Sequence, residues 1–204
     1  MGQIKKAKLV TVLTHQAATH PTTIVGDPID CTLASRAIIY LYHGYVEATA
    51  DTNSGSFLIQ LRPEAASSSV KENWLTHTTK TCGTTTPDTE AMTATEPAGE
   101  TVLACASTTG FAVGDKLYIQ NATLATSEWA LLRKFTADTS ITLVDGLTRA
   151  QASGSVIWND SNLWVVELDV TAVDAFRVVF HHEGATGANG HIKALASLHE
   201  GESN

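Results

Sequence analysis

The sequence predicts an all-β protein, a jelly-roll-like antiparallel β-sandwich that carries an inserted small β-barrel module. The apolar segments are short, alternating and rich in β-branched residues, and polar turn clusters such as VGDP and DTNSG separate them. No segment keeps a helical period. Of 204 residues, 43% are hydrophobic and only 17% are charged, so the chain can bury a substantial core.

Six segments outside the middle of the chain are expected to be the sandwich strands. Each one is a run of alternating or β-branched apolar residues that is bounded by turn residues. Strands at this spacing with polar loops are typical of a sandwich or barrel. The six segments are residues 8–14, 36–48, 56–63, 162–170, 175–182 and 191–198.

The middle of the chain differs in composition. Residues 79–100 are rich in threonine, and short apolar runs follow: TVLACAS, DKLYIQ, SEWALLRKF, SITLVDG and GSVIW. We therefore expect a small β-barrel-like module at residues 96–158, inserted between two parts of the sandwich, residues 1–95 and 159–204. Such an insertion in an exposed loop costs little, because loop-closure entropy grows slowly with loop length.

These runs carry a resemblance to a known class of proteins. The stretches STTGFAVGDKLYIQN, SEWALLRKF and SITLVDGLTRAQ resemble a small β-module common in virion proteins of tailed bacteriophages. Its marks are a Gly-Phe-x-x-Gly-Asp turn before one strand and a Glu-Trp pair before the next. Gly110 and Gly114 permit this turn, Asp115 can hydrogen-bond its backbone, and Trp129 is expected to fill the module's core.

The flanking segments, RAIIYLYHGYVEA and LWVVELDVTAVDAFRVVFHHEGATGANGHIKA among them, resemble phage structural proteins of the decoration or head-associated kind. The resemblance implies a non-enzymatic capsid decoration or cement protein that stabilises the phage head by bridging shell subunits. It further implies synthesis in the host cytoplasm and a place on the capsid exterior. The implied partners are major capsid protein subunits and further copies of the chain, as a homotrimer.

Two alternatives stay open. The chain could be a head–tail connector or tail-associated structural protein, or it could be a carbohydrate-binding or glycan-cleaving accessory module. Exposed aromatic side chains would favour glycan binding, and Trp74, Trp158 and Trp164 are the candidates. All three lie beside apolar strands, a position that favours the protein core.

The charge balance argues against nucleic acid as a partner. The chain has 13 lysines and arginines against 21 acidic residues, a net charge of −8, whereas phosphate contacts need a basic surface. No apolar run approaches the length of a membrane span, so we expect no membrane partner. The exception is a basic N-terminal stretch with Lys5, Lys6 and Lys8, a candidate arm for contact with an acidic neighbour.

The histidines near the end of the chain raise the question of a metal site. His181 and His182 are adjacent, and neighbours in a strand point to opposite faces, so they cannot easily bind one ion. A hairpin could bring His182 near His191, with Glu183 as a further ligand, but zinc normally needs three or four ligands. We therefore expect no metal and no cofactor.

No other cluster predicts catalysis. Glu167 and Asp169 lie two apart, a spacing that could serve acid–base chemistry on a glycoside, but alternation with Val166, Leu168 and Val170 places them on a solvated face. The cysteines, at positions 31, 82 and 105, lie at no metal-ligand spacing and are expected to be buried free thiols. The sequence thus predicts no catalytic residue and no enzyme.

Overall fold

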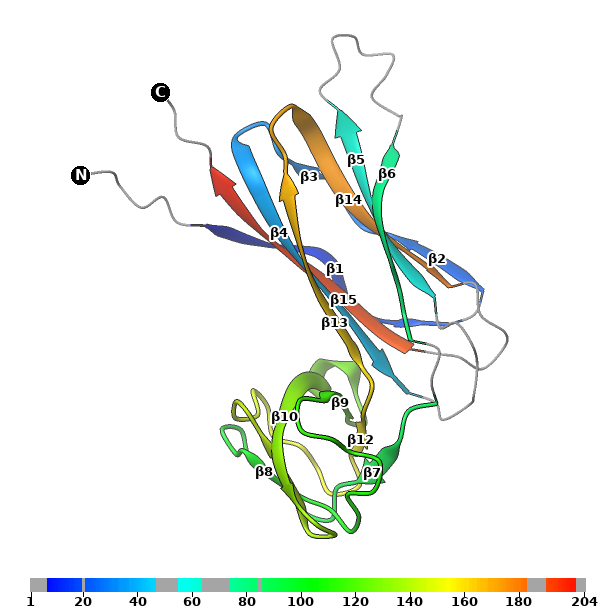
Figure 1. Cartoon of the computed structure of the whole chain (residues 1–204), viewed down its shortest axis with the longest axis vertical. Coiled ribbons are helices and arrows are strands. Elements are labelled where there is room, and N and C mark those ends of the chain that lie inside the picture. Colours follow the sequence, from blue (N-terminus) through cyan, green and yellow to red (C-terminus); the bar gives the residue numbers. More distant parts are fainter. Residues whose placement is uncertain are drawn as a thin grey trace, which may run out of the picture.

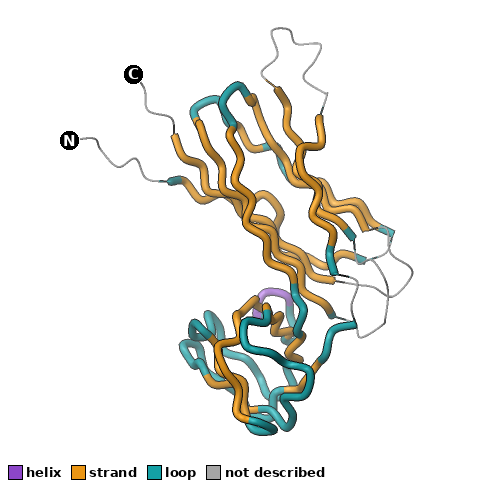
Figure 2. Tube along the Cα trace, viewed as in Figure 1, coloured by secondary structure: helices purple, strands orange, loops and turns teal. Residues whose placement is uncertain are grey.

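The computed structural model describes residues 7–19, 21–46, 55–63, 74–83, 86–182 and 190–200. These residues form two packed β-sheets with a small β unit at one end of the sandwich (Figures 1 and 2). The only helical element in these ranges is a 3₁₀ turn, η2 (Leu124–Thr126). The predicted all-β sandwich is therefore confirmed.

The two sheets of the sandwich each contain four strands in a row. The first has the order β1 (Lys8–Ala18), β15 (Gly190–Glu200), β4 (Ala34–Tyr45) and β13 (Asn162–Asp169). The second has the order β2 (Thr22–Val25), β14 (Val173–His182), β5 (Ser56–Pro63) and β6 (Leu75–Thr81), and β3 (Ile29–Asp30) also pairs with β14. All these pairs are antiparallel, and this strand order is that of a jelly roll.

Alternation along the strands builds the core between the sheets. Every second residue of β4 points inward, so Ala37, Ile39 and Leu41 are fully buried, as are Val178 and Phe180 of β14. Ile38, Tyr40 and Tyr42, which point outward from β4, are only partly buried. Apolar residues at a period of two thus become one continuous core, as expected for strands with one buried face.

The inserted module is a second β unit with a core of its own. Its strand order is β7 (Thr89–Ala91), β12 (Val156–Trp158), β9 (Lys116–Gln120), β10 (Glu128–Thr136), β11 (Ser140–Leu143) and β8 (Val102–Ala104). A bridge between Met92 and Cys105 joins the two outer strands, and Thr93 N donates to Ala104 O at 2.9 Å. The six strands therefore close on themselves as a small barrel.

The barrel begins earlier in the chain than the expected boundary at residues 95 and 96. Its first strand, β7, comes from the threonine-rich segment and pairs with β12. At the neck of the module, Asp88 N donates to Asn159 Oδ1 (2.7 Å) and Asn159 N donates to Asp88 O (3.1 Å). The points where the chain enters and leaves the module are therefore adjacent.

The Gly-Phe-x-x-Gly-Asp turn has the expected local structure. Gly110 and Gly114 have φ values of 83° and 95°, in the left-handed region that favours glycine. The Asp115 carboxylate accepts a hydrogen bond from Ala112 N at 2.7 Å. This turn delivers the chain into β9, which contacts β4 of the sandwich.

Candidate functional site

The basic arm starts at the end of the sandwich that lies away from the module. Lys8 is the first residue of β1, where it pairs with Leu198 of β15, and its side chain is exposed. β1 begins and β15 ends side by side at this end (Figure 1). Lys5 and Lys6 lie outside the described residues.

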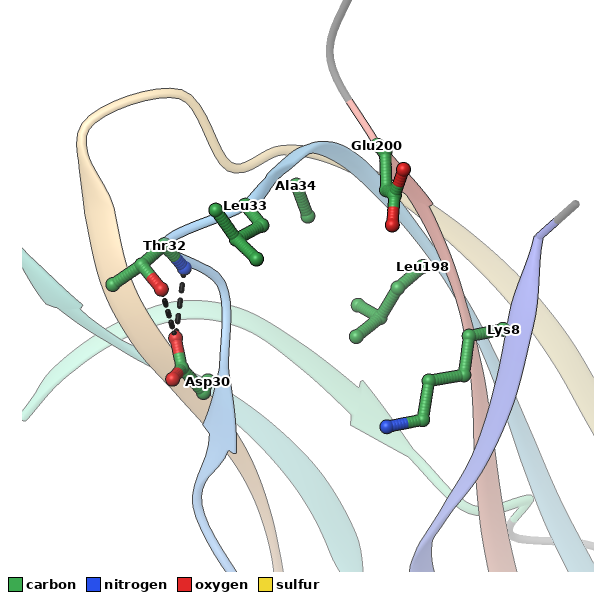
Figure 3. A pocket seen from close by; sticks show the side chains of 7 residues that line it. All are labelled: Lys8, Asp30, Thr32, Leu33, Ala34, Leu198 and Glu200. Carbon is green, nitrogen blue, oxygen red and sulfur yellow. Dashed lines mark hydrogen bonds between the residues drawn. The ribbon is translucent and has the colours of Figure 1, made fainter. Parts of the chain in front are cut away.

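Lys8 borders a pocket of about 260 Å³ that we call the mouth pocket. Figure 3 shows that Lys8 and Leu198 face the turn that joins β3 to β4 across this pocket. Ala34 and Leu198 also pack against the sandwich core, so the pocket is the open end of the space between the sheets. The complete lining is Lys8, Asp30, Thr32, Leu33, Ala34, Leu198 and Glu200.

Hydrogen bonds fix the turn at the mouth pocket. Ala34 N donates to Cys31 O at 2.8 Å, and both the backbone N and the Oγ1 of Thr32 donate to Asp30 Oδ1, at 2.8 and 2.7 Å (Figure 3). These bonds favour the carboxylate, so they lower the pKa of Asp30. The turn holds Leu33 at its tip with 80% of the residue exposed. Leu33 and Lys8 thus lie on the same pocket, and hydrogen bonds hold the turn that carries Leu33.

The adjacent histidines of β14 do point to opposite faces. His182 is 2% exposed, whereas His181 is less buried and its Nδ1 lies 2.7 Å from Thr23 Oγ1. Residue Glu183 and the rest of the 183–189 segment lie outside the described residues. Within the described ranges, no three histidine, cysteine or acidic side chains are grouped so that they could hold a metal ion.

The structure groups histidines that the sequence leaves far apart. His15 and His191 lie on either side of Tyr118 of β9, whose hydroxyl is 3.0 Å from His15 Nε2 and 2.5 Å from His191 Nδ1. His43 is fully buried nearby, and neither of its ring nitrogens has a hydrogen-bond partner among the described residues. No spacing in the sequence reveals this group, because His15, His43 and His191 come from three different strands.

Burial makes these imidazoles poor bases. Desolvation is the main cause that lowers the pKa of His15 to about 4, and the charges of His191 and Lys193 lower it further. Desolvation also lowers the pKa of His43 to about 3 and shifts that of His191 in the same direction. These lowered pKa values favour neutral imidazoles at neutral pH. On Tyr118, one ring nitrogen accepts the hydroxyl proton while the other donates its N–H to the hydroxyl oxygen.

Trp129 does not fill the module's core, contrary to the expectation from the sequence. Its ring instead lies at the junction with the sandwich, with ring-centroid distances of 4.7 Å to His15, 5.3 Å to Tyr42 and 4.8 Å to Tyr118. The module's core consists of aliphatic residues with Phe111, and leaves Trp129 out. Trp129 is therefore part of the docking surface between the two units.

The other tryptophans divide between the core and the surface. Trp158 is 6% exposed at the junction, and Trp164 packs against the sandwich core beside Phe57. Trp74 stacks on arginine, with the guanidinium carbon of Arg177 at 4.3 Å from its ring centroid and that of Arg62 at 5.4 Å. The core expectation thus holds for Trp158 and Trp164, whereas Trp74 covers two arginines.

The carboxylates of β13 lie on the exposed face, as alternation predicts. Val166, Leu168 and Val170 are buried, and Glu167 forms an ion pair with Arg36 at 2.6 Å. The three cysteines are buried free thiols, as expected, and desolvation raises the pKa of Cys31 to about 11. None of these residues contributes to the mouth pocket or the histidine group.

Comparisons with known proteins give little further information. No protein-family model and no curated protein matches the chain. A solved structure of the infectious bursal disease virus Gx strain aligns over 97% of this chain and 82% of its own, at 10% identity and a TM-score of 0.23. The Gt strain aligns over 99% and 83%, at 11% identity and a TM-score of 0.20. Likenesses at such TM-scores carry no argument about fold or function.

No helix in the described part of the chain is long and apolar enough to cross a membrane.

Proposed function

We propose that the chain is a non-enzymatic virion structural protein of a tailed bacteriophage, a decoration or cement protein that bridges subunits on the outside of the capsid. Two things support the proposal. The module and its flanks resemble phage virion proteins, and the jelly roll is an architecture used by viral capsid and lectin domains. Because a fold alone does not determine function, the proposal depends on a surface.

The observation that carries the proposal is the mouth pocket. Lys8 and the exposed Leu33 lie at one end of a rigid sandwich, where the basic N-terminal stretch begins. The exposed Leu33 beside Lys8, Asp30 and Glu200 suits a shell subunit that presents an apolar patch with a charged rim, and the lysine-rich N-terminal stretch favours an acidic neighbour. The module, at the opposite end, would then project away from the shell.

Attachment of this kind has to be multivalent. Exposed charge contacts contribute on the order of 0–1 kcal/mol each, so one basic arm cannot hold the protein on a capsid. A trimer placed at a symmetry position of the shell would engage several subunits at once and convert weak contacts into strong binding. We therefore include self-association as a homotrimer in the proposal.

Co-sedimentation with capsids of the phage that encodes the chain, across a salt series, tests the proposal. We expect the wild-type protein to pellet with shells and not with isolated shell subunits. The change of Lys5, Lys6 and Lys8 to glutamine should weaken binding a few-fold and flatten its salt dependence. Leu33→Ser should weaken binding at every salt concentration, and Lys80→Gln, on β6, is the matched control.

The alternative of a connector or tail-associated protein predicts a different result. Electron microscopy of labelled particles would place a connector or tail-associated protein at the portal vertex or tail rather than over the shell. A protein that stays in the supernatant at every salt concentration is not a decoration protein. Sedimentation equilibrium measures the oligomeric state, and a monomer at micromolar concentration would contradict the trimer.

A further inference from the structure

A second recess lies at the other end of the sandwich, where the module docks. A pocket of about 380 Å³ opens between β1, β4 and β15 of the sandwich and the η2–β10 region of the module. A neighbouring pocket of about 520 Å³ shares Tyr42, Glu128, Trp129 and Thr148 with it. We call the two together the junction cleft. Volumes of this size are typical of small-ligand sites.

The cleft has an aromatic wall contributed by both units. Trp129 of the module and Tyr42 of the sandwich line both pockets, and their ring centroids are 5.3 Å apart. The larger pocket continues over aliphatic residues such as Leu147 and Leu163. Neither unit alone has this wall, so the cleft exists only while the module is docked. A ring-shaped ligand with an apolar face could lie along it.

The junction cleft is lined by three cationic side chains, Lys116, Arg149 and Lys193, and by two carboxylates, Glu128 and Asp145. The Glu128 carboxylate is saturated, because it accepts hydrogen bonds from Thr148 N (2.8 Å), Thr148 Oγ1 (2.5 Å), Gln151 Nε2 (2.8 Å) and Arg149 N (3.3 Å). Arg149 and Lys193 also line the cleft, and neither has a carboxylate partner among the described residues.

Arg149 and Lys193 place positive charge beside His15 in the cleft. Desolvation and His191 are the larger causes that lower the pKa of His15, and Lys193 and Arg149, which line the same pocket, lower it further. Lys193 Nζ lies 5.9 Å from the ring centroid of Tyr42. The smaller pocket thus carries two cations against one carboxylate, in a chain whose net charge is −8. It favours a ligand that brings a negative charge to Arg149 and Lys193.

We propose that the junction cleft binds an acidic oligosaccharide, with a sugar ring against Trp129 and Tyr42 and a carboxylate at Arg149 and Lys193. Sugar rings present an apolar C–H face to aromatic side chains, and uronate-type sugars carry the carboxylate beside it. The two adjoining pockets suit two or more consecutive sugar units. This site lies at the opposite end of the sandwich from the mouth pocket and does not depend on the proposed capsid attachment.

Titration of the full chain with trigalacturonate, followed by isothermal calorimetry and tryptophan fluorescence, tests the inference. We expect binding with a Kd on the order of 1 mM or tighter, together with a change in tryptophan emission. The fully methyl-esterified trisaccharide has the same rings without the charge and should bind at least tenfold more weakly. Inorganic phosphate, a charge without a ring, should do the same.

Matched variants localise the binding. Arg149→Gln combined with Lys193→Gln should weaken trigalacturonate binding about tenfold, because two exposed charge contacts are lost. Lys134→Gln, an exposed change on β10 outside the cleft, should leave binding unchanged. If trigalacturonate does not bind at a concentration about tenfold above the expected Kd, the inference is wrong. Equal binding of acid and ester, equal binding of phosphate, or full binding by the double variant would overturn it as well.

Discussion

Tyr118 of the module lies directly against Gly44 of the sandwich. A Cβ atom added to Gly44 would come within 2.3 Å of Tyr118 Cγ, so only glycine leaves room for the ring. Tyr118 is fully buried, although it belongs to the module, and it packs in a small cluster with Tyr45 and Trp158. One aromatic side chain thus anchors one separately cored unit on the other.

Gly44→Ala should therefore loosen the module without unfolding either unit. The added methyl group overpacks a tight contact, a change that typically costs about 1–3 kcal/mol, and displacement of Tyr118 avoids the clash. We expect faster amide hydrogen exchange at the junction and a shift in Trp129 fluorescence, with unchanged circular dichroism. Ala17→Val, at an exposed position of β1, is the control. Unchanged exchange in Gly44→Ala would show that the contact does not hold the module in place.

Tyr118→Phe separates the ring's packing from its hydrogen bonds. Phenylalanine keeps the contact with Gly44 but leaves His15 Nε2 and His191 Nδ1 without their shared partner. Loss of a partner to partly buried polar groups costs about 1–3 kcal/mol. We expect the melting temperature to fall by roughly 2–12 °C for a chain of this size. A melting temperature equal to that of the wild type would mean that water replaces the hydroxyl.

The histidines near the junction should make stability depend on pH. His15 and His43 have folded-state pKa values of about 4 and about 3, below the ordinary value of 6.5, so the folded protein binds fewer protons than the unfolded chain. The stability they contribute is fully present above pH 6.5. It is lost as the pH falls from about 6.5 toward 4 and 3.

Thermal unfolding measured between pH 7.5 and 4 checks this. We expect a loss of about 3 kcal/mol from the fully buried His43, which corresponds to roughly 6–12 °C, and a smaller further loss from the half-buried His15, whose charge water screens. His43→Leu should reduce the slope of melting temperature against pH. His77→Gln, at an exposed position of β6, should not change the slope. A flat profile for the wild type would contradict the burial of the imidazoles.

The sequence predicts strands well where one face is buried and poorly where neither is. Ser56–Pro63 alternates against the core and matches its predicted bounds. β6 (LTHTTKT) was not predicted, because as an edge strand it has exposed or partly exposed residues throughout and hence no apolar periodicity. The sequence does not predict β7 (TEA) either, because this edge strand also has no buried residue.

The functional surfaces were harder to predict than the strands. Lys8 was identified from charge alone, but Leu33 became a candidate only once the structure showed it at the tip of a turn. The sequence predicts the wrong core for Trp129, because the position of a tryptophan in a strand does not indicate which neighbour it packs against. The junction cleft forms only when the two units dock. That contact joins residues far apart in the sequence, such as His15 and Tyr118, which are 103 positions apart.

Removal of the module tests whether the sandwich folds alone. The two cores share no residue, and Asp88 and Asn159 are hydrogen-bonded to each other at the neck, so a short linker can replace residues 88–159. The deletion exposes Gly44, Tyr45 and His15, but it leaves every strand of the jelly roll and the whole sandwich core in place.

We expect the shortened chain, with a Gly-Ser linker, to be soluble and to unfold cooperatively with a lower melting temperature. The expected loss reflects the small aromatic cluster of Tyr45, Tyr118 and Trp158, which the two units share at the junction. Residues 86–160 expressed alone should give a β-type circular dichroism spectrum, since the barrel closes through Met92 and Cys105. A shortened chain that is insoluble or unfolds without cooperativity would show that the sandwich needs the module, because exposed apolar surface at its end then outweighs what the separate core contributes.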